Sequence, residues 1–218
     1  LGATLKSLPS APDMMYFLLG RALYTDGLSA IFVFGGIYGT AIFGWQVVER
    51  GLFGIILTLI GVFGALGGGF LDDRIGAKRV IIGSLVFLMI GCIGILSVSA
   101  THILFATPYA AKVAGAPPFS STGEMVFLGF AMLVAAVAAP NQASSRSLLA
   151  RLAPPDKITQ YFGLFAFSGK VTAFLAPFMV ATVTAVSGSQ RVGMAAILLF
   201  LAVGLVLMLP VKERRRSE

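Results

Sequence analysis

The stretch "GGGFLDDRIGAKRV", residues 67–80, separates two long apolar runs and decides how the chain is organised. Residues 51–71 carry no charge, and residues 72–79 then hold two aspartates, two arginines and a lysine. A charge-free run of 21 residues matches the roughly 30 Å hydrocarbon layer of a bilayer at about 1.5 Å rise per residue. We therefore interpret residues 67–80 as a short polar hinge between two membrane-spanning helices.

The composition of the whole chain supports a membrane protein. Of its 218 residues, 57% are hydrophobic and only 11% are charged, whereas a soluble domain carries roughly 25% charged residues. A large soluble core would also raise the hydrophobic fraction, but it would not need charge-free runs of membrane length. The sequence therefore predicts an all-α integral membrane protein.

The apolar pattern predicts six transmembrane helices, at residues 14–43, 51–71, 80–100, 125–145, 158–186 and 192–211. The fourth continues as an amphipathic extension toward residue 152. Residues 1–13 precede the bundle, residues 101–124 form its midpoint loop, and residues 212–218 form a basic tail. Three spans on each side of the midpoint loop suggest a three-plus-three inverted repeat, an arrangement used by transporters.

The positions of the basic residues predict the orientation in the membrane. The end that holds the 72–79 hinge and both termini carries twelve lysines and arginines, and the opposite end carries three. Cytoplasmic loops are enriched in these residues. We expect both termini in the cytoplasm, most simply at a bacterial inner membrane. The net charge of +7 then reflects this charge band, and nucleic acid is not an expected partner.

The sequence holds no signature of an enzyme or a metal site. It lacks a phosphate-binding glycine loop and an H-E-x-x-H motif. Its one cysteine, Cys92, lies in an apolar run, and its one histidine, His102, lies near the end of a span. We expect no catalytic residues, no metal and no cofactor.

The hinge resembles the signature loop of the major facilitator superfamily, which follows the second span of each six-helix half. The resemblance rests on the order G-x-L-x-D-R-x-G-x-K-R, made by the following residues: Gly69, Leu71, Asp73, Arg74, Gly76, Lys78 and Arg79. It implies that Asp73 lies at a helix end and pairs with basic residues of a neighbouring helix. Such a latch would stabilise the outward-facing state of a transporter and bias alternating access.

Further stretches are similar to the vacuole effluxer-like, or unknown-major-facilitator, family. These are "NQASSRSLLARLAPPDKITQYFGLFAFSGKVTAFLAP" at 141–177, "RALYTDG" at 21–27 and "GGIYG" at 35–39. The resemblance covers most of the chain but corresponds to the C-terminal half of a twelve-span member. It implies a partner half of six spans, and its yeast members imply amino-acid efflux.

Two ionisable residues lie deep in the predicted spans. Asp26 and Lys170 are each twelve residues from the start of their span, or about 18 Å at 1.5 Å per residue. Because charges inside hydrocarbon are costly, they face a bundle interior or water and are candidates for function. We expect both at a shared cavity, paired directly or through a zwitterionic solute; Asp26 could instead carry a coupling proton. A structural ion pair that only orients the two helices is the alternative.

Four other polar residues are candidates for the same substrate or ion cavity: Arg21, Tyr24, Asn141 and Gln142. Arg21 and Tyr24 share a helix with Asp26, and Arg21, about 10 Å from the membrane surface, is expected to extend its charge toward that surface. Pro140 is expected to kink the fourth span, and the amides of Asn141 and Gln142 could satisfy the backbone groups that a kink frees.

The small residues and the single tryptophan carry weaker structural signals. The pairs Gly35–Gly39 and Gly64–Gly68 have the spacing that allows close helix contacts. Trp45 is expected at the membrane interface, where tryptophan is enriched.

These features favour a role as one half of a secondary-active transporter that exports a small polar solute such as an amino acid. If Asp26 carries a coupling proton, a proton gradient drives this export. The chain does not begin with Met, and we expect it to derive from a longer or processed protein. The alternative is a half-size membrane subunit that does not transport and instead scaffolds a larger membrane complex.

Overall fold

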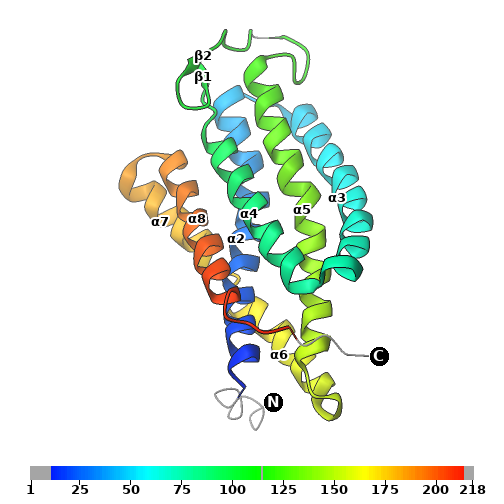
Figure 1. The fold of residues 1–218 in the computed structure, drawn as a ribbon. Helices are drawn as coiled ribbons and strands as arrows, with labels where there is room; N and C mark the ends of the chain where they lie inside the picture. The colour runs from blue at the N-terminus through cyan, green and yellow to red at the C-terminus, as the bar shows by residue number, and fades with distance from the viewer. Residues whose placement is uncertain (1–10, 114, 214–218) are drawn as a thin grey trace.

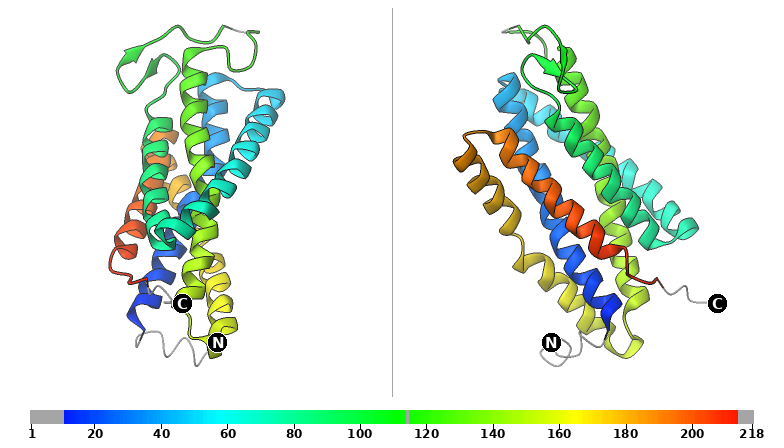
Figure 2. Two further views of the ribbon diagram at one scale, coloured as in Figure 1. Left: turned by 45° about the vertical axis from the view of Figure 1, so that its right-hand side comes forward. Right: turned by 60° about the vertical axis from the view of Figure 1, so that its left-hand side comes forward.

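The computed structural model describes residues 11–113 and 115–213. Its helices are α2 (Pro12–Phe43), α3 (Val47–Ile75), α4 (Ala77–Leu96), α5 (Thr122–Leu152), α6 (Ile158–Val171), α7 (Leu175–Ser187) and α8 (Gln190–Met208), with the 3-10 turn η2 (Pro155–Lys157) before α6. Both ends of the described chain lie at one end of the bundle (Figure 1), here called the termini end. The opposite end, the loop end, holds the long connection between α4 and α5 in both views of Figure 2.

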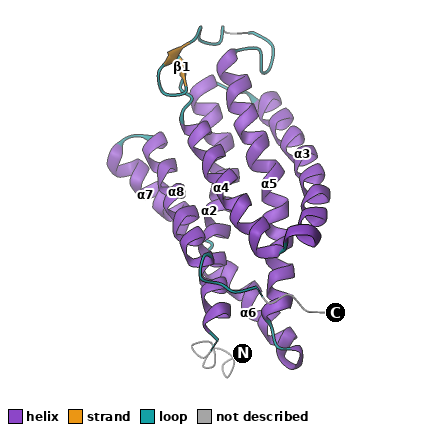
Figure 3. Cartoon of the chain, in the orientation of Figure 1, coloured by secondary structure: helices purple, strands orange, loops and turns teal. Residues whose placement is uncertain are grey.

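The all-α prediction with six spans is confirmed. Six segments of the described chain are long and apolar enough to cross a membrane. The only strands in that part are β1 (His102–Ile103) and β2 (Thr107–Pro108), which form one small antiparallel pair in the α4–α5 connection (Figure 3). Helix ends differ from the predicted spans by a few residues. The second span is longer and ends at Ile75, and the third ends already at Leu96.

The helices pack as two interlocked units of three. The first unit is α2, α3 and α4; the second is α5, the broken span α6–α7, and α8. The first helix of each unit packs along the third helix of the other: α2 on α8, and α5 on α4. The second helix of each unit packs on the first helix of the other unit: α3 packs on α5, and α6 packs on α2. Because α2 and α5 run in opposite directions, this packing is that of an inverted repeat.

Close approach of α3 to α5 depends on two glycines of α3. A Cβ at Gly64 would collide with the Ala136 carbonyl group, and one at Gly68 would lie 2.6 Å from Cγ of Pro140. The predicted small-residue contact at Gly64–Gly68 is therefore present, and it brings the α3 backbone against α5. Gly35, by contrast, has nothing within 4 Å of its Cβ position.

The fifth span is not one helix. It breaks between Val171, the last residue of α6, and Leu175, the first of α7. Pro177 contributes to the break, because a proline ring clashes with the carbonyl four residues earlier, that of Ala173, and supplies no N–H. α5, by contrast, continues through Pro140 as one helix, so the proline at which the sequence predicts a kink does not interrupt its span.

Aromatic side chains fill the loop end of the core. Trp45, which is 2% exposed, packs on the rings of Phe43, Phe53, Phe119 and Phe127 at centroid distances of 5.1–5.6 Å. Trp45 is therefore buried at the loop end of the bundle, and its expected place at the membrane interface stays a prediction.

Candidate transport site and ion-pair network

Arg21 is held inside the bundle between α2 and α6. It is 8% exposed, its Nη1 donates to the Phe165 carbonyl at 2.8 Å, and its guanidinium lies 3.4 Å from the centre of the Phe165 ring. The neighbouring Gly169 leaves room for the guanidinium, because a Cβ there would lie 2.9 Å from Nη1. The expectation that Arg21 reaches out to the membrane surface is wrong; a stacked guanidinium is fixed in place.

Tyr24 joins α2 to α5. Its hydroxyl is 2.8 Å from Oγ of Ser145, and that Oγ donates to the Asn141 carbonyl at 2.6 Å. Because the single hydroxyl hydrogen of Ser145 is used in this way, Tyr24 is the donor to Ser145. Tyr24, Ser145 and Asn141 are all buried, so this hydrogen-bonded chain links α2 and α5 inside the bundle.

The side-chain amides after Pro140 do not satisfy its freed backbone groups. Neither Nδ2 nor Oδ1 of the buried Asn141 has a partner in the described chain, and the same is true of Ser144 Oγ. Gln142 is partly exposed, and no hydrogen bond of its side chain is present in the described residues. The expected amide repair is therefore wrong. Buried polar atoms without partners are costly, so Asn141 and Ser144 mark a place where a water or a solute group would be accepted.

Asp26 lies at the break of the fifth span. It is 2% exposed, and its Oδ2 accepts a hydrogen bond of 2.8 Å from the backbone N–H of Ala176, in the first turn of α7. A carboxylate at a helix N-terminus is favoured by the free amides and the helix dipole. Asp26 Oδ1 has no partner within the described residues, so half of the carboxylate remains available.

Lys170 does not meet Asp26. It lies in the last turn of α6, is exposed, and forms no ion pair within the described residues. The expected direct ion pair with Asp26 is therefore absent: the carboxylate binds the start of α7, and the ammonium lies on an open face. The two residues lie on either side of the same helix break.

The termini end is held by a three-residue ion-pair network. Arg151 of α5 pairs with Asp72 of α3, with Nη2 3.1 Å from Oδ1, and its Nη1 contacts Glu213. Glu213 also accepts hydrogen bonds of 3.1 and 3.0 Å from the backbone N–H groups of Ala77 and Lys78, the first residues of α4. This network joins α3, α4, α5 and the segment after α8, and Glu213 caps the N-terminus of α4.

The network corrects the role expected for Asp73. The carboxylate that pairs with a neighbouring helix is Asp72, because successive residues of a helix point about 100° apart and only one of the two faces α5. Asp73 is exposed, and Arg74 stacks on Phe70 of its own helix at 4.0 Å.

The other hinge residues have distinct places. Gly76 ends α3 with φ +93° and lies close to Glu213, and Lys78 donates to the Leu209 carbonyl at 2.7 Å. Gly69 and Arg79 are exposed.

A second network closes the loop end. Glu124, in the first turn of α5, is fully buried and accepts from Nε1 of Trp45 at 2.7 Å and from Nζ of Lys112 at 2.8 Å. Lys112 also lies 3.6 Å from Glu49 of α3. In the same loop, burial raises the pKa of Tyr109, and the negative charge of Glu124 raises it further. Tyr109 therefore stays protonated and donates to the Ser99 carbonyl.

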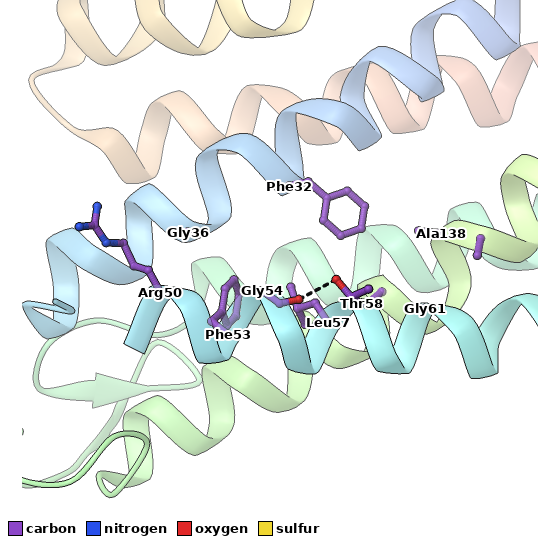
Figure 4. Close-up of a pocket in the computed structure, with 11 residues that line it drawn as sticks. Phe32, Gly36, Arg50, Phe53, Gly54, Leu57, Thr58, Gly61 and Ala138 are labelled. Carbon is purple, nitrogen blue, oxygen red and sulfur yellow. Dashed lines mark hydrogen bonds between the residues drawn. The ribbon is translucent and has the colours of Figure 1, made fainter. Parts of the chain in front are cut away.

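A groove of about 520 Å³ lies between α2, α3 and α5 toward the loop end (Figure 4). Phe32 of α2 faces Phe53 and Leu57 of α3 across it, and small residues of α3 and α5 form its floor. Arg50 is the one charged residue of its lining. The groove is thus apolar with a single cation at the mouth.

Comparison with known proteins identifies the family. Residues 1–218 match the family described as "Vacuole effluxer Atg22 like". The chain belongs to this vacuole effluxer-like family. The uncharacterized MFS-type transporter YxiO of Bacillus subtilis is 24% identical over 221 residues, which cover 100% of this chain and 45% of that protein. Autophagy-related protein 22 of Cryptococcus neoformans is 25% identical over 215 residues, which cover 98% of this chain and 37% of that protein.

Two consequences follow from these matches. The chain spans less than half the length of these two relatives, and its fold is that of one half of a major facilitator transporter. By name, the family is one of effluxers and the first relative is a transporter, not an enzyme, in agreement with the lack of an enzyme motif in the sequence.

Several residues of the two networks were missed by sequence reasoning. Glu124 could have been found, because "STGE" at 121–124 is a capping-box pattern. Glu213 is the acid within the otherwise basic stretch "KERRR" at 212–216. Residues 214–216 of this stretch lie outside the described chain. Arg151 is one of the twelve basic residues that predict the orientation; no local signal indicates its pairing, which depends on how α3 and α5 cross.

Proposed function

We propose that this chain is the C-terminal half of a secondary-active transporter of the major facilitator superfamily, which exports a small polar solute, such as an amino acid, by alternating access. The observation that carries the proposal is Lys170. It is exposed on the bundle surface although it lies twelve residues after Ile158, the start of α6. An ammonium at that depth is not stable against lipid chains, so its face is covered by water or by another part of a membrane protein.

The relatives supply what would cover that face. Because the chain spans less than half of their length, an N-terminal six-helix half is the expected partner, as in the two-half design of such transporters. The solute then passes between the two halves, and this chain contributes to the pathway the buried polar residues of α2, α5 and the fifth span.

Two features support alternating access. The Asp72–Arg151–Glu213 network ties together the helix ends at one side of the bundle, and it is suited to act as a latch that is made in one state and broken in another. The break beside Asp26 gives the fifth span a point at which it can bend. A proton that neutralises Asp26 would weaken its hold on α7, which makes Asp26 the candidate coupling residue.

The orientation follows the distribution of basic residues. The latch end carries most of the lysines and arginines, so we place it and both termini in the cytoplasm. For a bacterial protein this corresponds to the inner membrane, and for a vacuolar relative to the vacuolar membrane.

The test is transport by the full-length protein in sealed vesicles. Efflux of an amino-acid panel is measured with and without a pH gradient, and Asp26→Asn is compared with wild type. We expect saturable transport of some members and loss of the pH-gradient dependence in the variant. The proposal fails if no panel member moves faster than through empty vesicles while other membrane proteins co-purify tightly, which supports the scaffold alternative.

A further inference from the structure

The groove between α2, α3 and α5 (Figure 4) has the size of a small-molecule site. Its volume of about 520 Å³ lies within the roughly 300–1,000 Å³ of such sites. Glycines keep two of its walls open, because nothing lies within 4 Å of the Cβ positions of Gly36 on α2 and Gly54 on α3. The groove can therefore accept a ligand without a displacement of its helices.

Arg50 is the charge at the mouth of the groove, and the described chain does not neutralise it. Its Nε donates to the Gln46 carbonyl at 3.4 Å, and its two terminal nitrogens form no hydrogen bond or ion pair within the described residues. The adjacent Glu49 lies 3.6 Å from Nζ of Lys112 and accepts from the Gln46 backbone N–H at 3.0 Å. The free N–H groups of a guanidinium match the two oxygens of a carboxylate.

The rest of the lining favours an apolar body on the ligand. Phe32 of α2 lies across from Phe53 and Leu57 of α3, so a flat hydrocarbon group fits between these side chains. A narrower hollow, which shares all three side chains, reaches the core residues Ile95 and Val134. None of the described residues that line the groove is acidic. An ammonium group would lose its water there without gaining a charged partner.

We propose that the groove binds a soluble monocarboxylate with an apolar body, such as an arylalkanoate, and that Arg50 binds the carboxylate. The narrower hollow favours a compact body over a lipid chain, because it leads inward to the core and not along the surface of α3. α2 and α5, which form walls of the groove, also carry the buried polar residues of the proposed pathway. The inference rests on the proposed function and narrows its solute to this class.

Binding is measured on the purified full-length protein in nanodiscs of neutral phosphatidylcholine, by equilibrium dialysis with 3-phenylpropanoate. Empty nanodiscs give the background from partition into lipid, and neutral 3-phenylpropanamide is the matched probe without the charge. We expect saturable binding of the acid and none of the amide. Arg50→Gln should raise the half-saturating concentration of the acid about tenfold or more, the effect of losing a charge-assisted hydrogen bond. Equal binding of acid and amide by the wild type would overturn the proposal.

Two pairs of variants separate the groove from general effects of charge and size. Arg191→Gln removes a cation in the first turn of α8, outside the lining, and should leave binding unchanged where Arg50→Gln weakens it. Gly54→Leu places a side chain in the groove and should abolish binding at an unchanged melting temperature. Gly51→Leu is its control, because Gly51 also has nothing within 4 Å of its Cβ position but does not line the groove. Equal effects within either pair would contradict the inference.

Phenylalanine tests the absence of an acid from the described lining. It is 3-phenylpropanoate with an added ammonium group, and this group would be desolvated in the groove without a carboxylate to bind. We expect phenylalanine to bind about tenfold or more weakly than 3-phenylpropanoate. Equal affinities would show that the groove does not select monocarboxylates.

Two other occupants would give different results. If an anionic lipid fills the groove, phosphatidylglycerol in the nanodiscs raises the melting temperature of the wild type but not of Arg50→Gln, and 3-phenylpropanoate shows no saturable binding. If a helix of the N-terminal half fills the groove, Gly54→Leu lowers the melting temperature and neither the acid nor the amide binds. Either result would overturn the proposal.

The groove and the transporter proposal fail in different ways. Transport of the amino-acid panel that neither Arg50→Gln nor Gly54→Leu alters would refute the groove as the solute site and leave the transporter intact. Saturable binding of 3-phenylpropanoate that depends on Arg50, without transport of any solute, would leave the groove site intact and refute the transporter.

Discussion

The fourth and fifth spans both contain a proline, yet one is a continuous helix and the other is broken. α5 passes through Pro140 without interruption, whereas the fifth span stops at Val171 and resumes at Leu175, just before Pro177. A proline removes one N–H and displaces one carbonyl in either case. The difference therefore lies in what the neighbouring helices provide.

Around Pro140 the neighbour is another backbone. Gly64 places its Cα against the Ala136 carbonyl, the group that lacks a partner because of the proline, and Gly68 packs on the proline ring. A Cα–H group is a weak donor to such a carbonyl. α5 is also tied at both ends, through Glu124 and through Arg151. These contacts hold α5 in place along its whole length.

Around Pro177 the neighbour is a single side chain. Asp26 accepts the N–H of Ala176, and Thr172 reaches the Ala22 carbonyl at 3.3 Å. The fifth span is also less enclosed: 22% of its most apolar window is buried, against 39% for α5. Because the Asp26 carboxylate holds the break, the conformation of the fifth span can change when the charge of that carboxylate changes. Backbone contacts hold α5, so its conformation does not depend on a titratable group in this way.

The largest effect on stability is expected where α3 and α5 approach each other most closely, at Gly64. Gly64→Ala places a methyl group into the Ala136 carbonyl, and because backbone cannot give way as a side chain can, α3 and α5 must separate. We expect a loss of about 3 kcal/mol in the free energy of unfolding, the upper range for overpacking. Thermal unfolding of the full-length protein and its elution on gel filtration measure the loss.

A matched control is available one turn away. Gly67 lies on the same helix with nothing within 4 Å of its Cβ position, so Gly67→Ala should be tolerated. If Gly64→Ala and Gly67→Ala unfold at the same temperature, the clamp on α5 is not what keeps that helix intact.

A smaller effect is expected at the break. Asp26→Leu leaves the Ala176 N–H buried without an acceptor, which costs about 2 kcal/mol. Asp26→Asn retains a carbonyl oxygen for this bond and should lose well under half as much, since only the charge is removed. The two variants are compared by urea or thermal unfolding. Equal losses would show that the charge, and not the hydrogen bond, holds the start of α7.

The contrast between the two spans also shows how far the sequence could be interpreted. The spans, their number and the inverted repeat follow from apolar run lengths and the midpoint loop, because membrane length constrains helices strongly. Which proline breaks its helix does not follow, since Pro140 and Pro177 differ only in their neighbours. The same holds for Asp72 and Asp73, where a rotation of one residue decides which carboxylate faces Arg151.

A third prediction concerns the end of α5 at the latch. Arg151→Gln leaves Asp72 and Glu213 without their shared cation, and the Arg151 side chain is 30% exposed, so water compensates in part. We expect a loss of about 1 kcal/mol, near the top of the range for exposed pairs. Arg79→Gln is the control, because Arg79 is exposed in the same hinge and forms no ion pair in the described chain. Equal melting temperatures for the two variants would show that the ion pairs of Arg151 do not stabilise the end of α5.

The smallest effect on stability is expected when the prolines themselves are replaced. Pro140→Ala returns an N–H to the Ala136 carbonyl but loses the ring that Gly68 packs on, so the two changes offset each other to within about 0.5 kcal/mol. Pro177→Ala should also change stability little. It supplies a new N–H that can bond the Ala173 carbonyl and join α6 to α7.

Amide hydrogen exchange across residues 172–178 and around residue 140 distinguishes the two sites. We expect slower exchange in Pro177→Ala and unchanged exchange around residue 140 in Pro140→Ala. Unchanged exchange in both variants would mean that Asp26, and not Pro177, fixes the break, and the flexibility of the fifth span would then depend on that carboxylate alone.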